Sequence, residues 1–203
     1  LAGLKIYHSN PKSPASVKTQ LLHEIGNTTL QDNLLGSTLE YDVTGFFQVN
    51  LPVFVLALKR IADFTKDLAH KIDMYAGVGS IGIPIGGTEV LVELDEANVD
   101  MATNNARGKD IRVVQSSSEQ ALDYIKSDCC LIVDPPRSGL HKDVVDRILS
   151  QLPARVCYLS CNPATQARDV AMLSSAYSIS FFECYNFFPR TPHIETLILL
   201  EKK

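Results

Sequence analysis

The chain has 203 residues, of which 45% are hydrophobic and 21% are charged, so it is long enough to bury one good-sized core. Its formal net charge of −4 gives no overall electrostatic signal for nucleic-acid binding, and a polyanion would have to meet a local basic patch. Residues 1–14 do not resemble a signal peptide, and no apolar run approaches the ~18 residues of a membrane span. We therefore expect one main domain in a soluble, cytoplasmic protein without a membrane partner.

The five cysteines form no CxxC pair, and their odd number argues against a disulfide framework. Cys129, Cys130 and Cys157 lie within apolar runs, so we expect them to be small buried hydrophobic residues. With only five scattered histidines, the sequence gives little support for a metal site, and none is predicted.

The first 45 residues differ in pattern from the rest of the chain. Residues 8–16 are loop-like, whereas the alternating pieces at 28–33 and 37–43 are typical of short strands. We interpret residues 1–45 as the remnant of a β-rich unit, followed by a main domain over residues 46–203.

From residue 51 onward, helical and strand patterns alternate. Asn50 is expected to cap a helix that has Pro52 in its first turn. Strands are then predicted at about 71–76, 88–94, 111–115, 129–134 and 155–160, and helices near 79–85, 95–107, 118–126, 141–152 and 163–175. This alternation is the signature of an α/β fold, in which right-handed crossovers produce a mostly parallel sheet covered on both faces.

The C-terminal end departs from this alternation. The strand-like runs 177–188 and 194–203 follow each other with no helix between them, and Pro189 to Pro192 join them. We predict that they form an antiparallel pair at one side of the sheet, which brings the sheet to seven strands.

A glycine-rich turn follows the first strand of the series. Gly77, Gly79 and Gly82 fit the G-x-G-x-x-G pattern, and Glu93 closes the next strand, where a carboxylate can hydrogen-bond ribose hydroxyls. NAD and S-adenosylmethionine both present a ribose there, so both remain candidates. The alternative, a structural turn with a surface carboxylate, is weakened because both features lie at the carboxyl ends of consecutive strands.

The stretch "LIVDPPRSGL" places Asp134 at the end of a further strand. Its two prolines stiffen the chain and remove N–H donors, so the loop presents Asp134 and carbonyl groups in fixed positions suited to a flat, polar base. Arg137 either contacts a phosphate group or is an ordinary solvated arginine.

Two further candidates are a thiol and a carboxylate. Cys161 ends the fifth strand just before a helix, whose dipole would favour the nucleophilic thiolate, although position alone equally allows an inert buried cysteine. Glu195 lies at the start of the apolar run "IETLILL", where it is either an exposed strand-end residue or a desolvated general base.

Six stretches together resemble the S-adenosylmethionine-dependent RNA uracil-C5 methyltransferases, which make 5-methyluridine in transfer or ribosomal RNA. They follow the family's order from about residue 40 to 203: "FFQVN" (46–50), "DMYAGVGSIGIPI" (73–85), "VLVELDEANVDMATNNA" (90–106), "IVDPPRSGL" (132–140), "LSCNPATQARD" (159–169) and "FFPRTPHIETLILL" (187–200). The resemblance implies a Rossmann-like class I methyltransferase fold for residues 46–203 and a partial central domain for residues 1–45.

The resemblance also implies roles for individual residues. The family's nucleophile corresponds to Cys161, and its general base corresponds to Glu195. In that chemistry, thiolate addition at carbon 6 of uracil turns carbon 5 into a nucleophile, and the base later removes the carbon-5 proton. The implied contacts to S-adenosylmethionine are Gln48, Tyr75, Gly77, Gly79, Ser80, Glu93, Ser117 and Asp134, and the implied contacts to substrate are Phe46, Asp134 and Arg137. Phe187 and Phe188 are candidates to receive a flipped base, with core packing as the alternative.

Several features depart from the family. Ser117 stands where Asp or Asn is usual, the segment "PIGGTEV" indicates a shortened first helix, and the chain lacks the cysteine cluster of some relatives, so no iron–sulfur cluster is predicted. The N-terminal RNA-binding domain of the family is also absent from this sequence, and we expect RNA affinity to depend on such a domain. Two alternatives therefore stay open: a truncated RNA- or cofactor-binding module without turnover, and an NAD-dependent thiol dehydrogenase.

Overall fold

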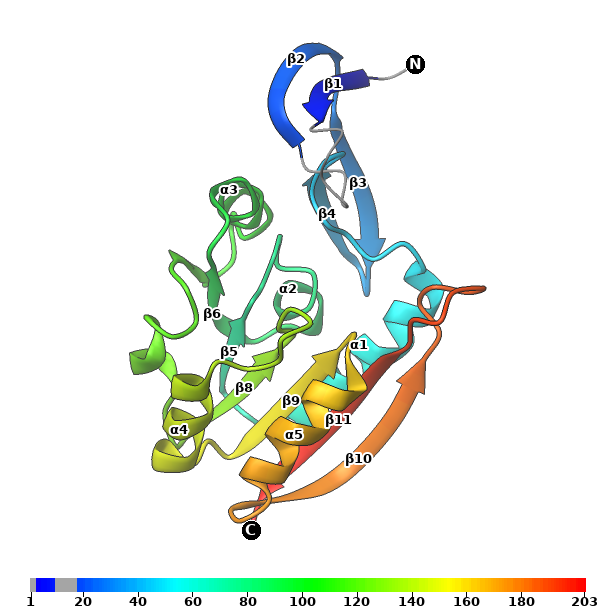
Figure 1. The fold of residues 1–203 in the computed structure, drawn as a ribbon. Coiled ribbons are helices and arrows are strands. Elements are labelled where there is room, and N and C mark those ends of the chain that lie inside the picture. Colours follow the sequence, from blue (N-terminus) through cyan, green and yellow to red (C-terminus); the bar gives the residue numbers. More distant parts are fainter. Residues whose placement is uncertain (1–2, 10–17) are drawn as a thin grey trace.

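The computed structural model describes residues 3–9 and 18–203. Two antiparallel hairpins come first in the chain (Figure 1), made by β1 (Gly3–Ser9) with β2 (Lys18–Gly26) and by β3 (Thr29–Leu34) with β4 (Ser37–Asp42). The short strands predicted at 28–33 and 37–43 are therefore confirmed. Of the predicted loop 8–16, residues 8 and 9 belong to β1, and residues 10–16 lie outside the described residues.

A seven-stranded sheet forms the centre of the molecule, with the strand order β10-β11-β9-β8-β5-β6-β7. Its strands are β5 (His70–Met74), β6 (Thr88–Glu93), β7 (Arg112–Gln115), β8 (Cys129–Val133), β9 (Arg155–Ser160), β10 (Tyr177–Tyr185) and β11 (Glu195–Lys202). The first five pair in parallel, whereas β11 is antiparallel to both β9 and β10. The mostly parallel sheet and the antiparallel C-terminal pair are both as predicted.

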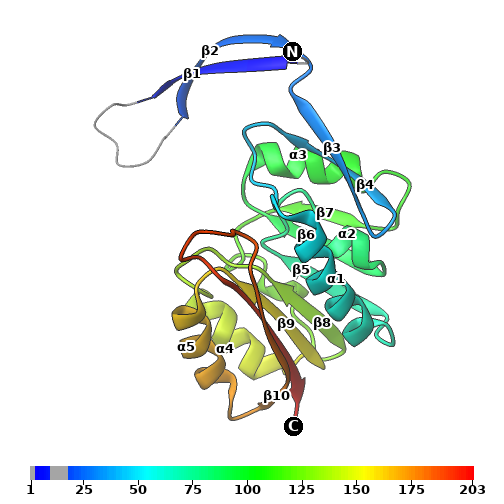
Figure 2. The ribbon, with the colours of Figure 1, turned by 90° about the vertical axis from the view of Figure 1, so that its right-hand side faces the viewer.

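Helices cover both faces of the sheet (Figure 2). They are α1 (Leu51–Thr65), α2 (Gly82–Ile85), α3 (Glu96–Asn105), α4 (Lys142–Gln151) and α5 (Pro163–Leu173). The first three lie on one face and α4 and α5 lie on the other. The prediction of a shortened first helix is confirmed, because α2 has four residues.

Two local predictions need correction. The helix predicted at 118–126 is a single 3-10 turn, η1 (Leu122–Tyr124), because the N–H groups of Tyr124 and Ile125 bond to carbonyls three residues back instead of four. Asn50 occupies the N-cap position of α1, but its side chain makes no capping bond and instead donates to the carbonyl of Asn186.

The core consists of two hydrophobic clusters, one on each side of the sheet. Successive strand residues point to opposite faces, so Cys157 and Leu159 join the cluster under α1, whereas Val156 and Tyr158 join the cluster under α4 and α5. Cys129, Cys130 and Cys157 are buried in these clusters, as predicted.

The two N-terminal hairpins differ in how they contact this core. Leu34 and Leu39 of the β3–β4 hairpin are fully buried in the α1-side cluster, and the Asn105 side chain of α3 bonds both the N–H and the carbonyl of Glu40. The β1–β2 hairpin projects away from the sheet in Figure 2 and exposes Leu22 and Ile25. The domain boundary after residue 45 stays a prediction. Within the part of the chain that the structure describes, we find no helix long and apolar enough to cross a membrane.

Candidate functional site

Two adjoining cavities open at the carboxyl edge of the sheet, where β5, β6, β8 and β9 end. The larger cavity, of about 750 Å³, is lined mainly by residues that follow β6, β7 and β8, including Leu94, Ser117 and Ser138, and by Arg168 of α5. The smaller cavity, of about 340 Å³, is lined by Phe46, Gln48, Ala76, Gly77, Val78, Ser80, Ile81, Asn98, Asp134, Pro135, Cys161 and Glu195. Tyr75, Glu93 and Pro136 line both, so the two cavities form one continuous site.

The glycine turn shapes one wall of this site. Gly79 has a positive φ of 84°, and a Cβ there would lie 2.5 Å from Ile83 Cδ1, while a Cβ on Gly82 would lie 2.8 Å from Asp73 Oδ2. Both positions therefore require glycine for packing. Gly77 also has a positive φ, of 56°, but among the described residues a Cβ on it would meet open space, in keeping with its place on the cavity wall.

Glu93 ties the glycine turn to the end of β6. One oxygen of its carboxylate accepts the Gly77 N–H at 2.8 Å, and the other accepts the Asp95 N–H at 2.8 Å. Each carboxylate oxygen has a second lone pair. Glu93 can therefore hold the turn in place and still accept a hydroxyl from a ligand in either cavity.

Tyr75 stands between the two cavities in a strained backbone conformation, with φ of 64° immediately after β5. A left-handed conformation at a non-glycine residue costs roughly 1–2 kcal/mol and often marks a functional site. Its phenolic oxygen accepts a hydrogen bond from Ser118 at 2.7 Å, and burial raises the pKa of Tyr75.

Gln48 brings a polar side chain into the smaller cavity. It is only 5% exposed, and its Oε1 atom has no hydrogen-bond partner among the residues that the structure describes. A buried amide oxygen without a partner costs about 1–3 kcal/mol, so Gln48 Oε1 is available to accept a hydrogen bond from a group that enters the cavity.

Asp73 is a second buried polar residue, and the sequence analysis did not single it out. It is completely buried, accepts the Gly82 N–H at 2.8 Å, and has its Oδ1 atom unpaired within the described residues. Burial raises its pKa to about 7. The available signal was an acidic residue in the middle of the apolar strand "KIDM".

Cys161 and Glu195 lie beside each other because of the pairing of β9 with β11. Thr196 pairs with Ser160 in that antiparallel ladder, and Glu195 and Cys161 are the next residue beyond this pair on each strand. Both side chains line the smaller cavity together with Asp134 and Phe46. The β9–β11 pairing thus unites two residues that are 34 positions apart in the sequence.

A buried network holds this pairing. Gln166 of α5 donates to the carbonyls of Tyr158 and Thr196, and its side-chain oxygen accepts the Thr196 hydroxyl at 2.6 Å. Gln166 and Thr196 are each about 1% exposed. The helix after Cys161 is therefore bonded to the strand that carries Glu195.

The sequence left open whether Glu195 is an exposed strand-end residue or a desolvated carboxyl group. The residue is only 3% exposed, so it is desolvated. Burial raises its pKa to about 7, and the positive charge of Arg137 acts in the opposite direction. Asp134 has its pKa raised well above the ordinary value, mainly by burial and then by the charge of Glu195. The site therefore holds carboxyl groups that can keep a proton near neutral pH.

The structure sets several influences against the thiolate form that the dipole of α5 favours at Cys161, and one in support of it. Burial raises the pKa of the thiol, Glu195 and Asp134 raise it further when they are ionised, and Arg137 lowers it. The thiol is partly exposed to the cavity, so it is accessible to a ligand.

The three phenylalanines considered for base stacking differ in how exposed their rings are. Phe46 is 66% exposed and lines the smaller cavity, whereas Phe187 is fully buried and packs edge-on against Phe54 at 5.6 Å between ring centroids. For Phe187 the core-packing alternative is therefore the correct one. Phe188 is partly buried against the core, with its ring edge-on to His193 at 6.4 Å.

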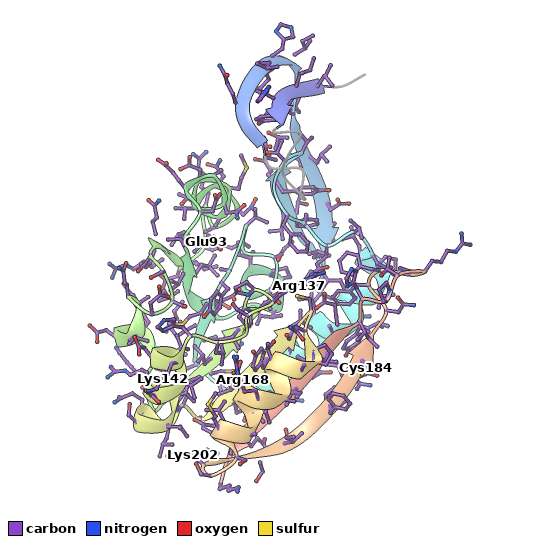
Figure 3. The ribbon with its side chains drawn as sticks, in the orientation of Figure 1. Glu93, Arg137, Lys142, Arg168, Cys184 and Lys202 are labelled. Atoms are coloured by element: carbon purple, nitrogen blue, oxygen red, sulfur yellow. The ribbon has the colours of Figure 1, made fainter. Side chains whose placement is uncertain are left out.

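Arg137 is close enough to Cys161 and Glu195 to lower the pKa of both, but it is outside the lining of both cavities as the described residues define them. Its guanidinium approaches the His193 ring at 3.4 Å, and Figure 3 shows it near the N-terminal end of α5. Among residues 3–9 and 18–203, no three His, Cys, Asp or Glu side chains form a group that could hold a metal ion.

Comparison with known proteins was made for sequence and for structure. Residues 120–203 match the family model described as tRNA (Uracil-5-)-methyltransferase. A curated protein of Prochlorococcus marinus, described as an uncharacterized RNA methyltransferase, is 34% identical over 183 residues, which cover 84% of this chain and 42% of that protein. The chain spans about half the length of the curated relatives it matches, or less.

The structural comparison agrees with the sequence comparison. The crystal structure of Pyrococcus abyssi tRNA (uracil-54, C5)-methyltransferase in complex with S-adenosyl-L-homocysteine superposes with a TM-score of 0.84 at 28% identity, covering 98% of this chain and 50% of that one. Trm5b of the same organism superposes with a TM-score of 0.70 at 14% identity, covering 99% of this chain and 64% of that one, which shows a shared fold alone. The fold is thus the Rossmann-like methyltransferase fold.

Proposed function

Because the chain belongs to the RNA uracil-C5 methyltransferase family and corresponds to its catalytic portion, we propose that it transfers a methyl group from S-adenosylmethionine to carbon 5 of a uridine in RNA. The observation that carries this proposal is the meeting of Cys161 and Glu195 in one cavity, which adjoins a second, larger cavity. A thiol and a desolvated carboxyl group side by side are the two groups that this chemistry needs.

The residues present fit S-adenosylmethionine as the methyl donor. The P. abyssi relative binds S-adenosylhomocysteine, the demethylated form of this donor. Here Glu93 retains lone pairs for ribose hydroxyls, the larger cavity with Ser117 and Leu94 accepts the adenine, and the unpaired Gln48 Oε1 suits a donor on the amino acid moiety or the uracil. Tyr75, Gly77, Ser80 and Asp134 complete this contact set, whereas Gly79 lines neither cavity and serves the packing of the turn.

The proposed reaction begins at Cys161. Its sulfur, as thiolate, adds to carbon 6 of the uracil, and the electron pair of the C5–C6 double bond moves toward the carbonyl oxygen at position 4 to give an enolate. Arg137 favours the thiolate by its charge. When bound, the sulfonium of the donor supplies the methyl group that carbon 5 takes up.

Glu195 completes the reaction. Its carboxylate removes the proton from carbon 5, the electron pair re-forms the C5–C6 double bond, and the Cys161 thiolate leaves. A pKa of about 7 suits this role, because the group is partly ionised near neutral pH and still basic enough to accept the proton. The balance is one methyl group gained by the uridine and one proton released.

The target uridine has to leave its stack to enter such a cavity. Phe46, exposed on the cavity wall, is the proposed platform for the flipped base, and Asp134 is the proposed partner of a polar uracil edge. Arg137 is the proposed contact to an RNA phosphate. We propose transfer or ribosomal RNA as the partner, with further RNA contacts made by a domain beyond this sequence, in the cytoplasm.

A methylation assay tests the proposal. The chain is incubated with labelled S-adenosylmethionine and bulk unmodified RNA, and the RNA is digested to nucleosides. We expect label in 5-methyluridine, and Cys161→Ala should reduce it to background. Label in another nucleoside, or none under any condition, would contradict the proposal. The assay is repeated with an added RNA-binding domain from a relative. Label that appears only with this domain indicates weak RNA binding, whereas no label in either case indicates the remaining alternative, a binding module without turnover.

A further inference from the structure

The loop between β8 and α4 carries Asp134, Pro136 and Arg137. Side chains from the first two turns of α5 hydrogen-bond to the backbone of this loop. The Asn162 amide donates to the Arg137 carbonyl at 2.8 Å. The single Thr165 hydroxyl hydrogen has two acceptors within reach, the same Arg137 oxygen at 3.2 Å and the Asn162 carbonyl at 3.1 Å. The Arg137 carbonyl is thus held by the N-terminal end of α5. Because Asn162 directly follows Cys161, the loop and the thiol are held as one unit.

Further hydrogen bonds to the loop come from the next residues of α5. Arg168 donates to the Ser138 carbonyl at 3.0 Å, and the buried Asp169 carboxylate accepts the Leu140 N–H at 2.8 Å. Gly139 packs so closely that a Cβ on it would lie 2.6 Å from both Arg168 and Asp169. Residues 137, 138 and 140 are therefore each bonded to α5, and the loop has little freedom to shift relative to it.

This fixed loop position affects which charged groups lie near the sulfur of Cys161. Three groups face its sulfur: Glu195 from β11 and Asp134 from the end of β8, which raise the pKa of the thiol, and Arg137, which lowers it. His193 contacts the guanidinium from the other side, at 3.4 Å. Arg137 is thus the single cation in this set that favours the thiolate, and its backbone position depends on α5.

We infer that Asn162 and Thr165 are positioning residues that act through Arg137, holding its guanidinium close to the sulfur of Cys161. This inference deepens the proposed function, because it assigns two further residues to the activation of the same nucleophile. Asn162 has a double role, since its side-chain oxygen also accepts the Ala164 N–H and caps α5.

The test measures the thiol directly, without RNA or S-adenosylmethionine. The rate at which iodoacetamide alkylates Cys161 is followed against pH by peptide mass spectrometry, with the exposed Cys184 on β10 as a reference thiol in the same molecule (Figure 3). Thr165→Val removes the hydroxyl, and Thr165→Ser is the matched control that keeps it. Asn162→Ser keeps a capping oxygen but is too short to reach Arg137.

We expect Thr165→Val and Asn162→Ser to raise the apparent pKa of Cys161 by up to about one unit, slowing alkylation at neutral pH by up to about tenfold. Thr165→Ser and Cys184 should remain unchanged. In an Arg137→Met background, neither Thr165→Val nor Asn162→Ser should change the pKa of Cys161 further, because the guanidinium through which they act is absent. The same shift in that background, or no shift in the parent background, would overturn the inference.

Methylation kinetics provide a second readout. If the inference holds, the loss of kcat in Thr165→Val at neutral pH is recovered at alkaline pH, where Cys161 is ionised in both proteins. A fall in kcat that is independent of pH would indicate a structural defect and overturn the role. The alkylation result stands even for a chain that does not methylate RNA, so failure of this inference and failure of the proposed function are distinguishable.

Discussion

Thr196 of β11 pairs with Ser160 of β9, and this one backbone pairing determines which side chains meet in the cavity. The next residues along the two strands are Glu195 and Cys161, so an antiparallel strand added to a parallel sheet supplies the carboxyl group opposite the thiol. Tyr75, Glu93 and Asp134 come from the ends of the parallel strands at the same edge, and Phe46 and Gln48 come from the segment before α1.

The pH dependence of stability should reveal the desolvated carboxyl group. The pKa of Glu195 is raised from 4.5 to about 7, so the stability contribution of this group is full below pH ~4.5 and is lost as the pH rises through 7. We expect Glu195→Gln to be more stable than the parent above neutral pH, by on the order of 1–3 kcal/mol, and equal to it in acid. Urea unfolding of both proteins across this range measures the difference, and a constant difference at all pH values would contradict burial of Glu195.

The glycine turn offers a matched pair of substitutions. Gly79 and Gly108 have similar positive φ angles of 84° and 74°, but only a Cβ at Gly79 would meet another described residue within 4 Å. We expect Gly108→Ala to cost roughly 1–2 kcal/mol from backbone strain alone, and Gly79→Ala to cost about 1–3 kcal/mol more from overpacking against Ile83. Thermal unfolding compares the two, and equal losses would show that the turn relaxes around the added methyl group.

The network under the site should be sensitive to one hydroxyl. Thr196→Val leaves the buried Gln166 oxygen without its 2.6 Å partner, so we expect a loss of about 1–3 kcal/mol in the free energy of unfolding. Thr196→Ser keeps the hydroxyl and should lose only about 0.8 kcal/mol for the missing methyl group. Denaturant unfolding measures both. If the valine variant is the more stable of the two, the network does not hold β11 to α5 as described.

Cofactor binding can be tested through Glu93. In Glu93→Gln, an amide NH₂ replaces an oxygen that accepts a backbone N–H, and the charge available to ribose hydroxyls is lost. We expect calorimetry to show at least about tenfold weaker binding of S-adenosylhomocysteine, equivalent to about 1.4 kcal/mol. Glu96→Gln, an exposed control three residues away, should bind normally. Binding of NAD in place of S-adenosylhomocysteine would instead support the dehydrogenase alternative.

Much of the fold could be predicted from the sequence because its signals are local. Apolar runs ending in Gly77, Asp134 and Cys161 mark parallel strands whose carboxyl ends must share one edge, and these residues do line one site. The failure at 118–126 also has a local cause, since helical spacing of Ala121 and Ile125 is equally compatible with one tight turn that buries both.

The electrostatics of the site could not be predicted, because they depend on contacts between distant residues. The burial of Glu195 follows from the β9–β11 register, and the raised pKa of Cys161 follows from its own burial and then from Glu195 and Asp134 beside it. Likewise, nothing in the sequence indicates that the Asn162 amide reaches the Arg137 carbonyl. Such relationships appear only once the strands are assembled.

The most direct test of the central claim is to trap the intermediate with Glu195→Gln. This variant keeps Cys161 but lacks the base, so with uridine-containing RNA and S-adenosylmethionine we predict a complex that survives denaturation, whose mass equals protein plus RNA plus one methyl group, with the crosslink at Cys161. The double variant Cys161→Ala, Glu195→Gln should form none. Methylation of uridine at carbon 5 by Cys161→Ala at the parent rate, with no complex in Glu195→Gln, would contradict the account.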